Sequence, residues 1–180
     1  MAQNLVRPNA MFRLATVNDL PDICRIIDEA RTLLAQDGIP QWQGSYPDLD
    51  TIREDIDREW SYVLDIDGHA VATSTLGQAP DPNYAELLSG QWAPGSDTPY
   101  AAIHRTAIAS GYRGHHLSRN LFCGLIDEAW RLGYRQLRID THQLNARMRH
   151  IIDEHGFRYA GVVFVRGNRD DRRNVYQKFL

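Results

Sequence analysis

The amino-acid sequence predicts one mixed α/β domain, and three observations lead to this prediction. Segments with helical and with strand-like apolar spacing alternate along the 180 residues. Asp67-Gly68 joins two runs rich in β-branched residues, which is a good signal for a β-hairpin. An apolar strand at 102–109 runs through a basic, glycine-containing turn straight into an amphipathic helix at 118–132. We expect a single domain at 11–180, preceded by an extension at 1–10.

The N-terminal segment is expected to form a strand, a capped turn and a long helix. Asn18 or Asp19 is the expected N-cap, because a short polar side chain there accepts from backbone N–H groups that the helix leaves unpaired. Pro21 suits the first turn, where its missing N–H is not needed. Apolar residues then recur along one helical face, namely Ile23, Ile26, Ile27, Ala30, Leu33 and Leu34.

The central segment is expected to contain a loop, a second helix and the hairpin. Two prolines, a glycine and Trp42 make 40–50 a loop, and a more polar helix follows at 49–60. The hairpin occupies 61–76. Proline, glycine, aspartate and serine are frequent at 80–99, which we expect to be the longest irregular stretch.

The C-terminal segment completes the alternation of elements. Gly133 is the expected C-cap of the amphipathic helix, a strand follows at 134–142, and a shorter helix at 145–154. A last hairpin joins strands at 159–165 and 174–180. The predicted order is therefore strand, two helices, several strands, helix, strand, helix and two strands.

Composition and charge argue against several classes of protein. The formal net charge of −3 is unlike that of a general nucleic-acid binder, which usually has a basic surface. The arginine-rich run at 166–173 is expected to be a solvated hairpin loop, with contact to a polyanion as the alternative. No segment has the length of a membrane span or the pattern of a cleaved leader, so we expect a cytoplasmic protein with no nucleic-acid and no membrane partner.

Cysteine and histidine usage indicates neither a disulfide nor a metal site. Cys24 and Cys123 both lie beside apolar residues in predicted helices, where a buried thiol acts as a small apolar group. None of the seven histidines belongs to a helical i, i+4 pair with an intervening glutamate, as zinc enzymes use. We therefore expect no metal.

The basic turn before the amphipathic helix has the features of a phosphate site. Backbone N–H groups at a helix start have no intrahelical partner, and the helix dipole adds partial positive charge there. Arg113, His115, His116 and Arg119 place cationic or potentially cationic side chains around the same turn. An ordinary capped helix start, without a ligand, is the alternative.

The turn resembles the acyl-CoA motif of the GNAT superfamily of N-acetyltransferases. That motif is Arg or Gln, two residues, Gly, one residue, then Gly or Ala. Arg113 matches the first position and Ser118 is a small residue at the last, while His116 stands where the family has its middle glycine. The resemblance in element order covers about 11–180. It implies a mostly antiparallel central sheet flanked by helices, with splayed central strands, and acetyl-CoA as co-substrate.

The resemblance also implies which residues hold the donor. The main chain of the strand at 102–109 would bind the pantetheine arm and polarise the acetyl carbonyl, through Thr106, Ala107 and Ile108. The diphosphate would lie on the turn with Arg113, and the remaining residues of that turn are Gly114, His115, His116, Leu117, Ser118 and Arg119. Asn145 matches an asparagine that contacts the cofactor in the family. Its alternative role is a plain N-cap, and the two roles are compatible.

Two side chains are candidates for the catalytic base. Asp140 ends the strand at 134–142, where several family members carry a glutamate, and its alternative is a structural pair with Arg138 or His142. His104 lies on the central strand in phase with Thr106 and Ile108, and its alternative is a core histidine whose hydrogen bonds are satisfied.

The tyrosine that protonates the departing thiolate in many family members is replaced by Ile152. Tyr84, Tyr112, Tyr159 and Tyr176 are possible substitutes from other elements, and the sequence does not choose among them. Because a CoA thiol is acidic, loss of the tyrosine lowers the expected rate without excluding turnover.

Trp42 and Glu86 are the candidate acceptor-binding residues, because both lie in loops expected to flank the acceptor pocket. Their alternatives are a tryptophan that anchors its loop and a solvated loop carboxylate. The resemblance predicts an N-acetyltransferase that acts on a small-molecule or peptide amine, and a homodimer is possible. A non-catalytic acyl-CoA-binding module and a protein-interaction domain that has lost the ligand both remain open.

Overall fold

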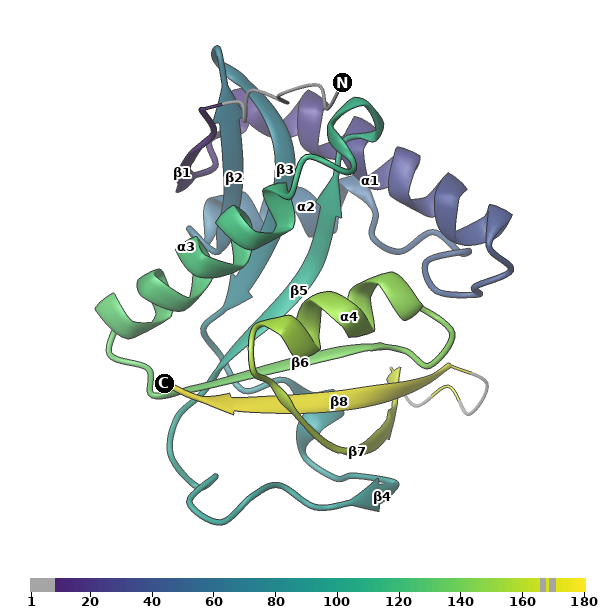
Figure 1. The fold of residues 1–180 in the computed structure, drawn as a ribbon, viewed down its shortest axis with the longest axis vertical. Helices are drawn as coiled ribbons and strands as arrows, with labels where there is room; N and C mark the ends of the chain where they lie inside the picture. Colours follow the sequence, from purple (N-terminus) through teal and green to yellow (C-terminus); the bar gives the residue numbers. More distant parts are fainter. Residues whose placement is uncertain (1–8, 166–167, 169–170) are drawn as a thin grey trace, which may run out of the picture.

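A computed structural model, which describes residues 9–165, 168 and 171–180, contains one eight-stranded sheet with helices on both faces (Figure 1). The strands run in the order β1-β2-β3-β5-β6-β8-β7-β4. They span Met11–Leu14 (β1), Ser61–Ile66 (β2), His69–Gly77 (β3), Ser89–Gly90 (β4), Ala101–Ile108 (β5), Gln136–His142 (β6), Arg158–Phe164 (β7) and Arg172–Phe179 (β8). Every neighbouring pair is antiparallel except β5 and β6. The expected mixed, mostly antiparallel sheet is confirmed.

Among the described residues, the helices α1 to α4 and the 3-10 turns η1 to η3 complete the order that the sequence predicted. The helices span Leu20–Gln36 (α1), Leu49–Asp57 (α2), Leu117–Arg131 (α3) and Ala146–Glu154 (α4). The 3-10 turns lie at Val17–Asp19 (η1), Pro82–Tyr84 (η2) and Ser110–Tyr112 (η3). The predicted hairpin joins β2 to β3, and its turn residues Asp67 and Gly68 both have positive φ, at 53° and 84°. Two residues of positive φ are what a type I′ turn requires.

The core divides between the two faces of the sheet. One apolar cluster lies under α3 and α4 and contains the fully buried Leu121, Leu125 and Ile152. A second cluster lies under α1 and α2 and contains Ile26 and Val63. A third, smaller cluster packs the irregular stretch of 80–100 against β5, β7 and β8. The helices and this stretch therefore hold the central strands from both sides.

Parallel pairing between β5 and β6 is short, so the two strands diverge. Their register runs only from Ala101↔Leu137 to Ile103↔Ile139, although β5 continues to Ile108 and β6 to His142. Figure 1 shows β5 turning away from β6 beyond this point. The splayed central strands implied by the resemblance are confirmed.

A bulge in β5 accompanies the divergence. Thr75 pairs with His104 and Thr73 pairs with Ala107, so two residues of β5 oppose one of β3. Arg105 lies in the bulge with a φ of 50°, in the left-handed region that non-glycine residues rarely adopt. The extra residue breaks the alternation of faces: Ile103 lies in the cluster under α3, whereas Ala107 lies in the cluster under α1. The expectation that His104 shares a phase with Ile108 is therefore wrong.

Several local expectations need correction. The second helix ends at Asp57 rather than at residue 60, where the chain turns toward β2. Asp19 is the N-cap residue of α1, as expected, but its carboxylate makes no capping hydrogen bond to the helix; it accepts from the Thr16 N–H at 2.8 Å and pairs with Arg13 at 2.7 Å. Cys123 is exposed, because it lies on the outer face of α3.

The expectation of a solvated loop at 166–173 is wrong for one described residue, Arg173. Residues 166, 167, 169 and 170 lie outside the described residues. Arg173 belongs to β8 and is only 5% exposed, so this arginine is a buried side chain of the sheet. Among the described residues, none of the helices combines the length and apolarity needed to cross a membrane.

Close packing between α3 and β1 depends on Gly124. A Cβ at this position would lie 2.4 Å from Cγ of Phe12, whose ring stacks on Tyr62 with centroids 5.2 Å apart. The clash involves the base of a stacked ring, so a rotamer change does not relieve it.

We expect Gly124→Ala to lower the free energy of unfolding by about 1–2 kcal/mol, because overpacking costs about 1–3 kcal/mol and outweighs the gain of up to about 1 kcal/mol in helix propensity. Urea denaturation measures the change. Cys123→Ala, the neighbouring exposed position, is the control and should be neutral or slightly stabilising. A stabilised Gly124→Ala protein would contradict this account of the packing.

Candidate active site

The divergence of β5 and β6 opens a cavity of about 270 Å³. Its walls come from β5, β6, the C-terminal part of α1, the first two turns of α4 and the turn before α3. Thr106, Ala107 and Ile108 all line it, where β5 has no strand partner on the β6 side. The cavity therefore meets a part of the central sheet where main-chain groups of β5 have no strand partner on one side.

The turn before α3 contributes Arg113, Gly114 and Ser118 to the same cavity. Arg113 donates from Nε to the Ile108 carbonyl at 3.3 Å, which fixes its guanidinium beside the end of β5. Among the described residues, Arg113 Nη2 is the one buried side-chain N or O atom without a hydrogen-bond partner. A buried cationic donor without an acceptor is costly, so this group is suited to an anionic ligand.

The backbone of the turn explains why the acyl-CoA motif favours glycine. Gly114 has a φ of 83°, and His116 has a φ of 60° just before α3. His116 thus adopts the left-handed conformation that glycine adopts freely, and the turn keeps its shape. The side chains of His115, His116, Leu117 and Arg119 do not line the cavity, and Leu117 packs in the core instead.

A second, larger cavity of about 990 Å³ adjoins the first. It lies among the loop of 40–46, α2, the stretch of 77–83 and the start of β8. The residues common to both cavities are Gln41, Trp42, His104, Arg105 and Asp140. The two cavities therefore meet at the gap between β5 and β6.

Gln41 and Trp42 hold the loop of 37–48 over this gap. Gln41 is 7% exposed, and its Oε1 accepts from the His142 N–H at 3.2 Å and from Thr141 Oγ1 at 3.4 Å. The Trp42 carbonyl accepts from Arg31 Nε at 3.0 Å. Trp42 is half-buried, so it both anchors its loop and lines the cavities.

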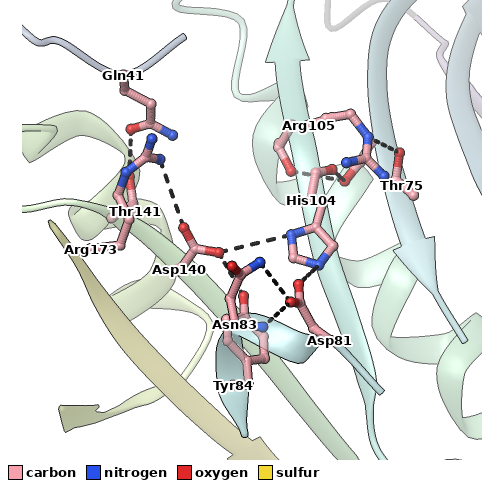
Figure 2. Close-up of polar contacts among 12 residues, drawn as sticks. Gln41, Thr75, Asp81, Asn83, Tyr84, His104, Arg105, Asp140, Thr141 and Arg173 are labelled. Atoms are coloured by element: carbon pink, nitrogen blue, oxygen red, sulfur yellow. Dashed lines mark hydrogen bonds and ion pairs between the residues drawn. The ribbon is translucent and has the colours of Figure 1, made fainter. Parts of the chain in front are cut away.

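His104 lies at the junction of the cavities, between two carboxylates (Figure 2). Its Nε2 is 3.0 Å from Asp81 Oδ2, and its Nδ1 is 3.9 Å from Asp140 Oδ1. Burial works to raise the pKa of the Asp81 carboxyl, but its contacts with His104 and Asn83 outweigh burial and lower that pKa. Asp81 is thus a carboxylate near neutral pH.

Asp140 is held by contacts on both of its carboxylate oxygens. Its Oδ1 accepts from the buried Tyr84 hydroxyl at 2.7 Å, and Arg173 Nη1 lies 3.8 Å from its Oδ2 (Figure 2). The structural partners considered in the sequence, Arg138 and His142, make no hydrogen bond or ion pair with Asp140 among the described contacts. Arg138 instead lies between the rings of Trp92 and Tyr100.

Arg105 stabilises the bulge of β5 by binding Asp55 of α2. Its Nε and Nη2 donate to Asp55 Oδ2 and Oδ1 at 2.6 and 2.8 Å, and Thr75 Oγ1 donates to Oδ2 at 2.8 Å. Its Nη1 donates to the Tyr46 hydroxyl. Burial works to lower the pKa of Arg105, but Tyr46 and Asp55 outweigh burial and raise it. This bidentate ion pair and the hydrogen bond to Tyr46 offset the strain of the positive φ at Arg105.

Some residues considered in the sequence lie apart from the junction. Glu86 is exposed and lines neither of the two cavities. Asn145 caps α4 by accepting from the Met148 N–H at 3.1 Å, and it also lines the first cavity, so both of its considered roles are geometrically open. Ile152 is fully buried in the core under α3 and α4. None of Tyr84, Tyr112, Tyr159 and Tyr176 lines either cavity.

Sequence reasoning missed Asp81, Arg105 and Arg173, which all line the larger cavity. Asp81 caps η2, because its Oδ1 accepts from the Asn83 N–H at 2.7 Å. The Asp-Pro-Asn triplet at 81–83 was the available signal, since it predicts an ordered turn within the irregular stretch. No comparable signal marked Arg105 or Arg173.

Comparison with known proteins decides the family. Residues 27–157 match the model of the acetyltransferase (GNAT) family. The chain belongs to the GNAT family. A GNAT-family acetyltransferase from Streptococcus agalactiae is similar in structure, with a TM-score of 0.85 and 31% sequence identity over 95% of both chains.

Two solved structures of lower sequence identity share the fold. The protein yncA from Salmonella typhimurium, solved with acetyl-CoA, has a TM-score of 0.69 and 18% identity over 95% of this chain and 94% of its own. A ribosomal-protein-alanine N-acetyltransferase from Brucella melitensis has a TM-score of 0.67 and 21% identity over 94% of this chain and 99% of its own. No curated protein sequence matches the chain.

We expect Asp55→Ala to lower the free energy of unfolding by about 3–5 kcal/mol, because it leaves the buried guanidinium of Arg105 without its carboxylate. Urea denaturation measures the loss. Asp57→Ala, at the exposed end of the same helix, is the matched control and should change stability by less than about 0.5 kcal/mol. Equal stability of the two variants would exclude the role given to this ion pair.

Proposed function

We propose that this GNAT-family protein transfers the acetyl group of acetyl-CoA directly to a primary amine of a small molecule or a protein. One observation carries the proposal: the cavity between β5 and β6 has a guanidinium with one unpaired nitrogen, Arg113 Nη2, at one end and a histidine between two carboxylates at the other. An anionic donor fits the first end, and an amine that must lose a proton fits the second.

The residues at the donor end fit the phosphates of acetyl-CoA. Arg113 Nη2 lacks an acceptor, and a phosphate oxygen would supply one. Gly114 and Ser118 line the cavity at the start of α3, where unpaired N–H groups and the helix dipole favour an anion. The Salmonella typhimurium protein, which shares the fold, was solved with acetyl-CoA, and this supports the choice of donor.

Main-chain groups of β5 are the candidates for polarising the thioester carbonyl. Thr106, Ala107 and Ile108 line the cavity beyond the last pair of β5 with β6. N–H donors fixed by a strand need no reorganisation when charge develops on the carbonyl oxygen, and such a donor contributes about 3–4 kcal/mol to lowering a barrier.

The acceptor amine would enter from the larger cavity. His104 and Asp140 lie where that cavity meets the smaller one, so either can contact an amine that approaches the thioester. Trp42 lines both cavities and is a candidate wall of the acceptor site. The Brucella melitensis protein of the same fold is named as an N-acetyltransferase of a protein, which supports an amine acceptor.

Among the described residues that line the two cavities, Tyr46 is the one tyrosine, and its hydroxyl accepts a hydrogen bond from Arg105. We therefore assign no tyrosine to the protonation of the leaving thiolate. Departure as the free thiolate is consistent with the acidity of a thiol, whose ordinary pKa is about 8.5. We therefore propose that proton removal from the amine, rather than protonation of sulfur, is where side chains assist.

A non-catalytic acyl-CoA-binding module is the second candidate, because Ile152 lies in the core where many family members carry their tyrosine. Such a module binds acetyl-CoA without thiol release. Release of CoA thiol in the presence of a broad amine panel distinguishes the two functions.

We expect acetyl-CoA at about a hundred times its Kd to stabilise the protein by about 2.7 kcal/mol, a rise in Tm of roughly 5–10 °C. NADH is the control for unspecific adenine-nucleotide binding. Arg113→Ala should weaken acetyl-CoA binding about ten- to a hundredfold, because a charged hydrogen bond is lost, whereas the exposed Arg53→Ala should not. No selective rise in Tm would contradict acetyl-CoA as the donor.

We expect wild-type protein to release CoA thiol with at least one amine of the panel, and His104→Ala to lower kcat by about 10²-fold or more while acetyl-CoA binding is kept. Asp140→Asn should also lower turnover. Thiol detection with a chromogenic disulfide measures the rate. Normal turnover in both variants would exclude these residues as the base.

A further inference from the structure

We propose that Asp81 is a positioning residue that fixes the tautomer of His104, so that Nδ1 of His104 takes a proton from an amine held by Asp140. The inference rests on the proposed function and extends it to a residue outside the acyl-CoA motif and outside the central sheet. Figure 2 shows the arrangement, with His104 between the two carboxylates.

Asp81 is held so that one oxygen faces His104. Its Oδ1 accepts from the backbone and side-chain nitrogens of Asn83, at 2.7 and 2.8 Å. Its own N–H donates to the Tyr100 hydroxyl at 2.9 Å, which ties this part of the loop to the start of β5. Oδ2 is then directed at His104 Nε2, 3.0 Å away. The side chain of Asp81 is only 13% exposed, so the contact is shielded from water.

This contact determines which nitrogen of neutral His104 carries the proton. A carboxylate only accepts hydrogen bonds, so Nε2 must be the donor. Nδ1 is then the nitrogen with a free lone pair. The lowered pKa of Asp81 keeps it ionised, so the same tautomer is favoured throughout the neutral range.

The lone pair of Nδ1 lies near Asp140 without a direct hydrogen bond to it, so an amine nitrogen can lie beside the two atoms and contact both. Nδ1 and Asp140 Oδ1 are 3.9 Å apart, which is too long for a direct hydrogen bond. Both side chains line the larger cavity and are 18% and 13% exposed. An amine nitrogen bound to Asp140 would therefore lie within reach of Nδ1.

Tyr84 holds in place the Asp140 oxygen that faces His104. The Tyr84 hydroxyl donates to Oδ1 at 2.7 Å. Complete burial and the nearby carboxylates raise the pKa of Tyr84 well above its ordinary value, so its phenol stays a donor. Asp140 therefore stays an acceptor, as is required to bind an ammonium group.

The other charged groups around His104 are already engaged. Arg173 Nη1 lies 3.8 Å from Asp140 Oδ2, and the rest of its guanidinium binds Asp171. Arg105, the next residue of β5, binds Asp55 and Tyr46. The Tyr84 ring lies 6.0 Å from the imidazole ring, and it is neutral. Asp81 and Asp140 are thus the two carboxylates that face His104.

Three proton transfers balance the reaction. An amine arrives as an ammonium ion, and one of its protons moves to Nδ1, which gives a free amine and an imidazolium paired with Asp81. The amine nitrogen then bonds to the thioester carbonyl carbon, the carbon–sulfur bond breaks, and sulfur leaves with the electron pair. The remaining surplus proton of the nitrogen passes to sulfur, and His104 returns its proton to water.

Asp81→Asn tests the proposal. The amide oxygen can still accept from Asn83, so η2 keeps its cap, but the amide N–H₂ now faces Nε2 and forces the proton onto Nδ1. The same exchange of Asp for Asn in a Ser-His-Asp triad gives the wrong tautomer and a large loss of kcat. We expect kcat to fall about 10²-fold, KM for acetyl-CoA to stay within about twofold, and the acidic limb of the rate profile to move to lower pH.

The exposed Asp97→Asn, in the same loop, is the matched control and should keep wild-type kinetics. Nitrogen-15 NMR of the histidine rings gives a second readout that does not depend on turnover, with His104→Gln used for assignment. The proposal requires protonated Nε2 in the neutral wild-type protein and protonated Nδ1 in Asp81→Asn.

Three outcomes are distinguishable. If wild-type protein turns over amines and Asp81→Asn keeps kcat within about threefold with an unchanged pH profile, the positioning role is overturned. A wild-type spectrum with protonated Nδ1 overturns it as well. If wild-type protein shows no turnover with any amine, the proposed function fails, and with it the catalytic use of His104, even where the spectra show the expected tautomer.

Discussion

The end of pairing between β5 and β6 is the constraint on which the rest of the site depends. Beyond Ile103 and Ile139 the two strands have no hydrogen bonds to each other, and the gap becomes a cavity lined by the main chain of one strand and side chains of both. His104 on β5 and Asp140 on β6 lie just beyond this point. Continued pairing would fill the gap with hydrogen bonds and remove the cavity.

An open gap in a central sheet leaves polar groups that other elements must satisfy. Gln41 from the loop of 37–48 accepts from the His142 N–H and from Thr141, and so takes the place of a neighbouring strand. Arg105 reaches α2 and binds Asp55, which holds the bulge against its strained backbone. Both partners come from elements earlier in the chain than β5 and β6. The two N-terminal helices and their loop are therefore part of what keeps the sheet open.

Local signals in the sequence predicted the elements well, because hairpin turns, caps and apolar periodicity act over a few residues. They also placed His104 on a central strand and Asp140 at the end of the next strand. They did not predict Asp81, because its contact with His104 depends on how an irregular stretch folds back over β5. The burial of Arg173 was hidden by the charged run around it, and the bulge at Arg105 reversed the alternation used to assign faces. In each case a long-range contact outweighed the local pattern.

The bulge in β5 has a consequence for variation in chain length. One extra residue separates the half of β5 that packs under α3 from the half that packs under α1. The side chains of both halves therefore face the correct side of the sheet only if β5 keeps its present number of residues. Deleting a single residue there would turn the cavity-lining half of β5 over, and a polar face would meet the core. Surface loops readily accept the insertion or deletion of a single residue, but we expect such a change within 104–106 to disrupt the fold. Side-chain substitutions at Thr106 leave the alternation of faces intact.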